Sequence, residues 1–195
     1  NKLTINESWT RTPTIPRFVK SADDLKFNSI YLFHVMGSWW GPFGTIGART
    51  SLLPGRDQRA ETTTFEISEI DGRKILKQTD RLKIAEAFAP TTIREALGIF
   101  AQPLRREWLN VELRLGIGAN HTFVNRGLTK DDNKDTADIV EYKRLRDYTT
   151  AGVEFEAELN GKLKKIVKYS LYGQIYWPFY KSLPTDLSQA DRIHA

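Results

Sequence analysis

The stretch from Val153 to Tyr180, VEFEAELNGKLKKIVKYSLYGQIYWPFY, carries the residue pattern that decides the fold. Its first part places apolar side chains at every second position, with glutamates between them. This is the period of a β-strand with one face buried. The apolar positions are Val153, Phe155, Ala157 and Leu159. The stretch therefore predicts a β-hairpin that continues into a strand rich in aromatic residues.

The turn of this hairpin is predicted at Asn160-Gly161, a residue pair typical of tight turns. A two-residue turn would mix apolar and charged side chains on one face. A three-residue loop over residues 159–161, with Gly161 in the left-handed region, instead pairs Ala157 with Leu163. Because register follows the choice that keeps one face apolar, the sequence predicts the three-residue loop.

Composition limits the classes of protein to which the chain can belong. It has 195 residues, a formal net charge of +5 and a pI near 9.4. That length fits one domain with a substantial core. The absence of cysteine excludes disulfides, a thiol nucleophile and thiolate metal ligands. The basic residues form short clusters, which favours a solvated surface over a binding face for nucleic acid or an anionic membrane.

No apolar run is long enough for a helix to cross a bilayer, and the first residues do not resemble a signal peptide. We therefore expect no membrane span and a cytoplasmic location. The chain divides into an N-terminal arm over residues 1–24, a single β-barrel-like domain over 25–181 and a C-terminal tail over 182–195.

One helix is predicted, near residues 92–102. Thr92 and Glu95 have the spacing of a capping box, and Pro103 would end the helix. Between them, apolar residues recur at helical spacing: Ile93, Ala96, Leu97 and Phe100. We expect this helix to close or cap a barrel.

The remaining segments favour strands. Residues 28–36 form a continuous apolar run, residues 62–82 read as a second hairpin, and residues 108–119 alternate between an apolar face and a polar one. The polar face faces either solvent or a polar cavity. The triplet Gly37-Ser38-Trp39 resembles the first strand of lipocalin-like barrels, which supports a barrel. The predicted fold is mainly β, an antiparallel barrel or strongly curved sheet.

Aromatic residues give the leading hypothesis for function. Small-molecule pockets are mostly apolar and aromatic, and tyrosine and tryptophan can also orient a ligand through their polar atoms. The sequence predicts a bulky hydrophobic ligand in an aromatic-lined cavity. The residues expected to bind it are Trp39, Trp40, Trp108, Tyr169, Tyr172 and Tyr176.

If the protein is an enzyme, the sequence favours cofactor-free isomerisation, dehydration or cyclisation of the ligand. The expected catalytic residues are His34, Asp80, Glu112 and Arg114, since a buried histidine or carboxylate can transfer protons near neutral pH. No metal site is predicted, because the three histidines lie far apart in the sequence.

Three alternatives remain open from the sequence. The protein is a non-catalytic ligand carrier, or it binds nucleic acid through basic and aromatic residues such as Lys168 and Tyr169. It also has the Glu-x-Lys spacing of a restriction-type nuclease core at residues 141–143. A homodimer is one option for its assembly.

Overall fold

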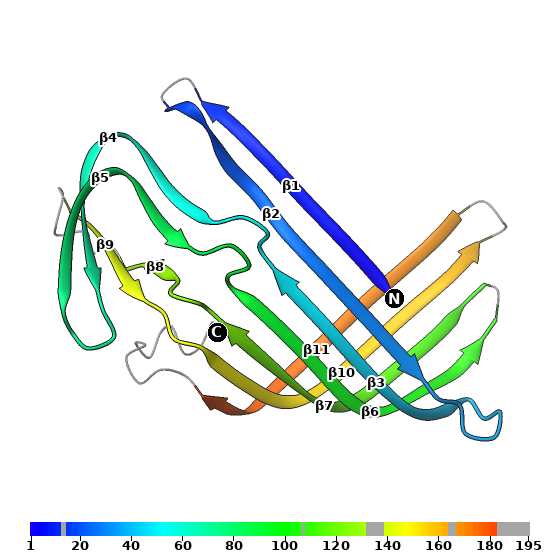
Figure 1. Ribbon diagram of the computed structural model, residues 1–195. Helices are drawn as coiled ribbons and strands as arrows, with labels where there is room; N and C mark the ends of the chain where they lie inside the picture. The colour runs from blue at the N-terminus through cyan, green and yellow to red at the C-terminus, as the bar shows by residue number, and fades with distance from the viewer. Residues whose placement is uncertain (13–14, 107, 132–138, 164–166, 183–195) are drawn as a thin grey trace.

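The computed structural model describes residues 1–12, 15–106, 108–131, 139–163 and 167–182, almost all of them in strands (Figure 1). The strands are β1 (Lys2–Thr12), β2 (Ile15–Leu32), β3 (Trp40–Thr50), β4 (Gly55–Ser68), β5 (Lys74–Ala85), β6 (Thr91–Arg105), β7 (Asn110–Phe123), β8 (Leu128–Lys130), β9 (Ile139–Arg144), β10 (Tyr148–Leu163) and β11 (Val167–Ser182).

Two sheets share these strands. The larger has seven strands in the order β1-β2-β3-β6-β7-β10-β11, and every neighbouring pair in it is antiparallel. It curls into a half-barrel (Figure 1), which confirms the predicted strongly curved antiparallel sheet. The smaller sheet has the order β5-β4-β9-β8 and contains one parallel pair, β4 with β9.

The two ends of the half-barrel differ. At one end, short connections join three pairs of strands: β2 with β3, β6 with β7, and β10 with β11. We call this the short-turn end. At the other end, the hairpins β4–β5 and β8–β9 are inserted and build the four-stranded sheet (Figure 1). That sheet has its own core of Phe65, Ile67, Leu82 and Tyr142. The hairpin predicted over residues 62–82 is therefore confirmed as part of β4 and β5.

The helix predicted near residues 92–102 is wrong, because these residues lie in β6, between β3 and β7. Ile93, Leu97 and Ile99 point to one face of the sheet, and the even-numbered residues point to the other. The apolar residues of this segment fit both the helical and the strand spacing. Pairing with the two neighbouring strands is what makes the segment a strand. Within the described ranges, no helix is long and apolar enough to cross a membrane.

The predicted hairpin register over residues 153–180 is also wrong. Strand β10 continues through Asn160-Gly161, and β11 pairs Ala157 with Gly173 rather than with Leu163. A Cβ atom at Gly161 would lie 2.2 Å from the carbonyl oxygen of Trp108. Gly161 therefore allows two backbones to approach closely and does not form the turn.

The segment expected to be an N-terminal arm contributes strand β1 and the first part of β2 to the large sheet. This pairing extends from Lys2 opposite Asn28 to Thr12 opposite Ile15, with register shifts after Ser8 and after Thr10. Most of the expected C-terminal tail lies outside the described residues. The division into arm, domain and tail otherwise stays a prediction.

Candidate functional site

Strand β10 has its apolar side chains exposed and its carboxylates buried. Val153 and Phe155 are 42% and 40% exposed, whereas Glu154 and Glu156 are only 2% and 6% exposed. A strand that packs on the core of a water-soluble sheet has the reverse arrangement. Side chains converge on the inside of a curled sheet and diverge on the outside, so the buried glutamates mark the inner face.

The same division extends across the seven-stranded sheet. Residues directly opposite each other on paired strands share a face. One such row contains Leu97, Ile117, Val153 and Trp177, which pair in that order across β6, β7, β10 and β11. All four are among the exposed large hydrophobic residues. We call this the outer face; its exposed apolar residues include Tyr31, Ile46, Leu97, Ile99, Leu115, Ile117, Val153, Phe155, Ile175 and Trp177.

Aromatic side chains mark both ends of this apolar face. At the short-turn end the exposed residues are Phe33, Trp39, Trp40 and Trp108, and they are joined by Met36. At the opposite end they are Phe88, Phe123, Phe179 and Tyr180. Between these two groups, the exposed residues of β6 and β7 are five leucines and isoleucines and one glutamate: Ile93, Glu95, Leu97, Ile99, Leu115 and Ile117.

Arg94 bridges two buried glutamates on the inner face. Its Nη2 atom lies 2.7 Å from Glu154 Oε2 and 2.7 Å from Glu156 Oε1. Burial opposes the charged guanidinium, but the hydrogen bonds and charges of these two carboxylates raise the pKa of Arg94. The arginine therefore stays charged on the inner face of the curl.

Arg114 extends this network along β7 and β10. It is 5% exposed and donates to Glu112 Oε1 at 2.7 Å, to Glu156, and to Glu158 Oε2 at 2.9 Å. Burial works against its charge, while Glu112 and the other two carboxylates raise its pKa. Four glutamates thus share two arginines, so the inner-face network carries an excess of negative charge.

Glycines make room for the inner-face side chains. A Cβ atom at Gly98 would lie 2.8 Å from the ring of Phe43, and one at Gly116 would lie 3.0 Å from it. A Cβ atom at Gly118 would lie 2.9 Å from Glu154 Oε2. Phe43 and the Glu154 carboxylate therefore lie directly over bare backbone, which lets the sheet curl tightly around them.

Three of the four predicted catalytic residues belong to one chain of hydrogen bonds on the inner face. Gln102 lies 3.3 Å from His34 Nε2 and donates to Glu112 Oε2 at 2.6 Å, and Glu112 accepts from Arg114. His34 also makes an edge contact with Phe100, with ring centroids 4.9 Å apart. Asp80 lies apart from this chain, on β5 of the four-stranded sheet.

The six aromatic residues predicted to bind ligand lie in several places. Trp39 and Trp40 are at the start of β3, Trp108 is in the β6–β7 connection, and the three tyrosines lie along β11. Tyr169 donates a hydrogen bond to the Trp108 carbonyl, and Tyr172 is opposite Glu158. The buried hydroxyl of Tyr176 has no hydrogen-bond partner within the described part of the chain.

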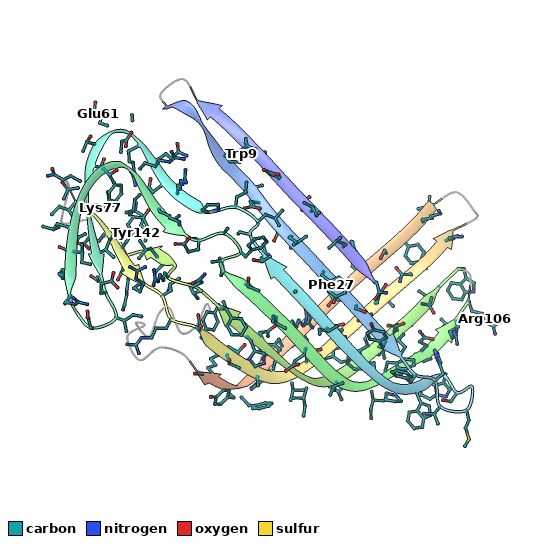
Figure 2. The ribbon with its side chains drawn as sticks, in the orientation of Figure 1. Trp9, Phe27, Glu61, Lys77, Arg106 and Tyr142 are labelled. Atoms are coloured by element: carbon teal, nitrogen blue, oxygen red, sulfur yellow. The ribbon has the colours of Figure 1, made fainter. Side chains whose placement is uncertain are left out.

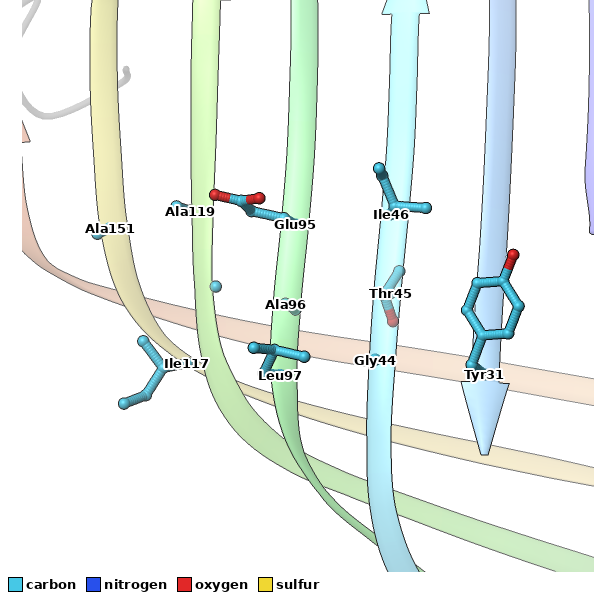
Figure 3. Close-up of a pocket in the computed structure, with 11 residues that line it drawn as sticks. Tyr31, Gly44, Thr45, Ile46, Glu95, Ala96, Leu97, Ile117, Ala119 and Ala151 are labelled. Atoms are coloured by element: carbon cyan, nitrogen blue, oxygen red, sulfur yellow. The ribbon is translucent and has the colours of Figure 1, made fainter. Parts of the chain in front are cut away.

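A shallow groove of about 610 Å³ crosses the outer face (Figure 3). Its lining is mostly apolar and combines large residues with glycines and alanines; it includes Tyr31, Ile46, Leu97, Ile117, Ala119 and Ala151. Glu95 adds a carboxylate that lies 3.3 Å from His121 Nε2. None of the six predicted ligand-binding aromatics lines this groove.

Sequence reasoning missed Arg94, Glu154, Glu156 and Glu158 as members of a buried network. The three glutamates belong to the strict alternation of β10. The sequence predicts that the apolar side chains of this alternation face the interior, whereas the structure places the glutamates there. Among the described residues, no cluster of histidine, aspartate and glutamate has an arrangement that could hold a metal ion. A nuclease core of the Glu-x-Lys type also needs a preceding acidic residue; of the aspartates before residues 141–143, Asp131 is described, whereas Asp132 and Asp135 lie outside the described residues.

Comparison with known proteins finds no matching family model, no matching curated protein and no matching solved structure. The geometry of the two faces is therefore the basis on which a function is proposed.

Proposed function

We propose that the seven-stranded sheet is part of the wall of a transmembrane β-barrel, with lipid against its outer face. This proposal replaces the sequence-based expectation of a cytoplasmic protein with no membrane span, which considered only spans by helices. The observation that carries the proposal is the alternation of exposed apolar and buried charged side chains along β10 and β7. Membrane barrels have apolar residues facing lipid and polar residues facing the lumen, in this same two-residue period. A water-soluble sheet would leave an unusually large apolar surface exposed to water.

The dimensions of the outer face support this proposal. Trp40 is opposite Ala101 at one aromatic end, and Phe123 is opposite Thr91 at the other. The segment of β6 between Thr91 and Ala101 has about ten residues, and at about 3.3 Å per residue it is roughly 33 Å long. With the tilt of roughly 40° usual in membrane barrels, it spans about 25 Å along the normal, the height of their apolar band.

The inner-face network suits the same role. A barrel lumen must hold charged side chains without exposing them to lipid, and pairing makes their burial tolerable. Arg94 and Arg114 serve this purpose by bridging carboxylates of neighbouring strands. In this proposal the four-stranded sheet extends into water beyond one end of the band.

The wall needs further strands to close. Seven antiparallel strands leave the two edge strands, β1 and β11, running in the same direction. An entirely antiparallel closed barrel therefore needs an odd number of additional strands between them. Unpaired backbone groups at an edge are costly in hydrocarbon, so lipid would favour that closure.

A matched pair of cysteine variants tests the lipid assignment, because the natural chain contains no cysteine to interfere. Ile175 and Gln174 are adjacent on β11, both are exposed, and they face opposite sides of the sheet. We would label Ile175→Cys and Gln174→Cys with a fluorophore and place each variant in lipid vesicles. Brominated lipid should quench only the label at 175, and aqueous iodide should quench the label at 174 more strongly.

The opposite result would overturn the proposal. If iodide quenches both labels equally and brominated lipid quenches neither, the outer face is not in contact with lipid. A protein that remains in the aqueous fraction with native β-sheet content would lead to the same conclusion.

A second candidate function is the binding of a bulky hydrophobic molecule, and the outer-face groove favours it. Its apolar lining and volume suit such a ligand, with the Tyr31 hydroxyl and Glu95 as polar contacts. Native mass spectrometry of the purified protein would test this candidate. Retention of a non-lipid apolar molecule, lost in a Leu97→Glu variant, would support it, and a ligand-free spectrum would argue against it.

A further inference from the structure

A groove at the short-turn end of the half-barrel is lined, among the described residues, by three cations and no carboxylate. Its volume is about 810 Å³, and Arg106, Lys162 and Lys168 contribute the positive charge. The neutral lining residues are Asn110, Asn160, Gly161, Tyr169 and Ser170. Figure 2 shows Arg106 at the end of the molecule opposite Lys77 and Glu61.

Two of these cations are held directly opposite each other. Lys162 on β10 pairs with Lys168 on β11, so both side chains leave the same face of adjacent strands. Like charges in this position repel and destabilise a sheet. Neither lysine has a carboxylate partner among the residues described. The next carboxylate along the inner face of β10, Glu158, is already bound to Arg114 and Asn160.

The connection that contains the third cation packs tightly against β10 and β11. Tyr169 on β11 donates a hydrogen bond to the carbonyl oxygen of Trp108, in the β6–β7 connection. Gly161 lets this connection approach β10, since any Cβ atom there would collide with the same carbonyl. These contacts hold the β6–β7 connection against β10 and β11, and Arg106 in that connection lines the same groove as the lysine pair.

We propose that this groove binds a phosphate-class oxyanion between Lys162, Lys168 and Arg106. An oxyanion would relieve the repulsion between the two lysines and accept hydrogen bonds from the guanidinium, while Asn110 and Ser170 offer neutral donors. This site goes beyond the proposed role of the sheet as a membrane wall. It does not depend on that role, because its residues come from connections and strand ends at the short-turn end.

The test is a calorimetric titration in which inorganic phosphate is added to the full chain in detergent. The variant K162Q/K168Q removes the opposed lysines, and R56Q/K77Q removes the same charge from exposed positions on the four-stranded sheet. We expect saturable binding by the natural protein and by R56Q/K77Q. We expect K162Q/K168Q to bind at least about tenfold more weakly, as for the loss of a hydrogen bond to a charged group.

Stability provides a second measurement. Phosphate should raise the midpoint of thermal unfolding of the natural protein but not that of K162Q/K168Q. Without phosphate, K162Q/K168Q should be at least as stable as the natural protein, because it no longer contains the repelling pair. Circular dichroism would establish that both variants keep their β-sheet content.

Two further binding measurements identify the source of the oxyanion. Vesicles of phosphatidylcholine with and without phosphatidylglycerol would show whether a lipid headgroup supplies it, and soluble phosphate alone would show that a free anion suffices. Absence of saturable phosphate or headgroup binding, or equal weakening in both variants, would overturn the proposal. So would far tighter binding of a single-stranded oligonucleotide that K162Q/K168Q abolishes, which would instead indicate a nucleic-acid surface.

Discussion

Replacing Leu97 with arginine distinguishes a lipid-facing sheet from a water-soluble one. Leu97 is 73% exposed and lies between the two aromatic ends of the outer face. If water surrounds it, the substitution should change the free energy of unfolding by no more than about 0.5 kcal/mol, as at other exposed sites. If lipid surrounds it, arginine near the middle of the band should cost about 2–4 kcal/mol.

The four-stranded sheet supplies a matched control. Leu76 on β5 is 63% exposed, so Leu76→Arg makes the same chemical change at nearly the same exposure but outside the apolar band. Both variants would be unfolded with urea in lipid vesicles and followed by tryptophan fluorescence. We expect Leu97→Arg to lose about 2–4 kcal/mol and Leu76→Arg to stay within about 0.5 kcal/mol of the natural protein.

Equal effects of the two substitutions would refute the reasoning. A small loss at both positions would mean that water reaches Leu97. A large loss at both would mean that the penalty arises from packing common to the two sheets. Only a loss confined to position 97 agrees with lipid at the outer face.

Other predictions concern the inner face, the backbone and the response to acid. Arg114→Ala should cost about 3–5 kcal/mol in urea unfolding, because it leaves buried carboxylates without their partner, and Arg114→Lys should recover part of the loss. Gly98→Ala should lower the thermal unfolding midpoint, since its Cβ would lie 2.2 Å from a backbone oxygen, whereas Gly173→Ala has open space and should be near neutral. Burial opposes the charged form of Asp57, but its bond to Arg59 keeps its pKa below the ordinary value. The ionised form of Asp57 therefore stabilises the fold above the pKa of the unfolded chain, which is about 3.9. The natural protein should be more stable than Asp57→Asn at neutral pH, and this difference in unfolding free energy should shrink as the pH falls below about 4.

Some features of the fold could be predicted from short-range pattern. The alternation at residues 108–119 and 153–159 indicates strands, and residues 110–119 and 153–159 lie in strands of the large sheet. The hairpin over residues 62–82 has turn residues at Asp71-Gly72, and Gly72 adopts a positive φ of 83°. These signals are local, because backbone geometry alone sets the two-residue period and the turn conformation.

Other features depended on partners distant in the sequence. The segment over residues 92–102 fits a helix until β3 and β7 pair with both its edges. Asn160-Gly161 fits a turn until Trp108 approaches it. The inner-face network also escapes sequence reasoning, because Arg94 is far along the chain from the glutamates that it binds.

The sequence by itself determined that this chain forms amphipathic strands, since alternation is a property of neighbouring residues. It did not determine which side of each strand faces the interior. Only the curl of the assembled sheet decided that, by crowding Glu154 and Arg114 together and spreading Val153 and Leu97 apart. The physical reason is that burial depends on curvature and on neighbouring strands, and neither is set by the order of residues within a single strand.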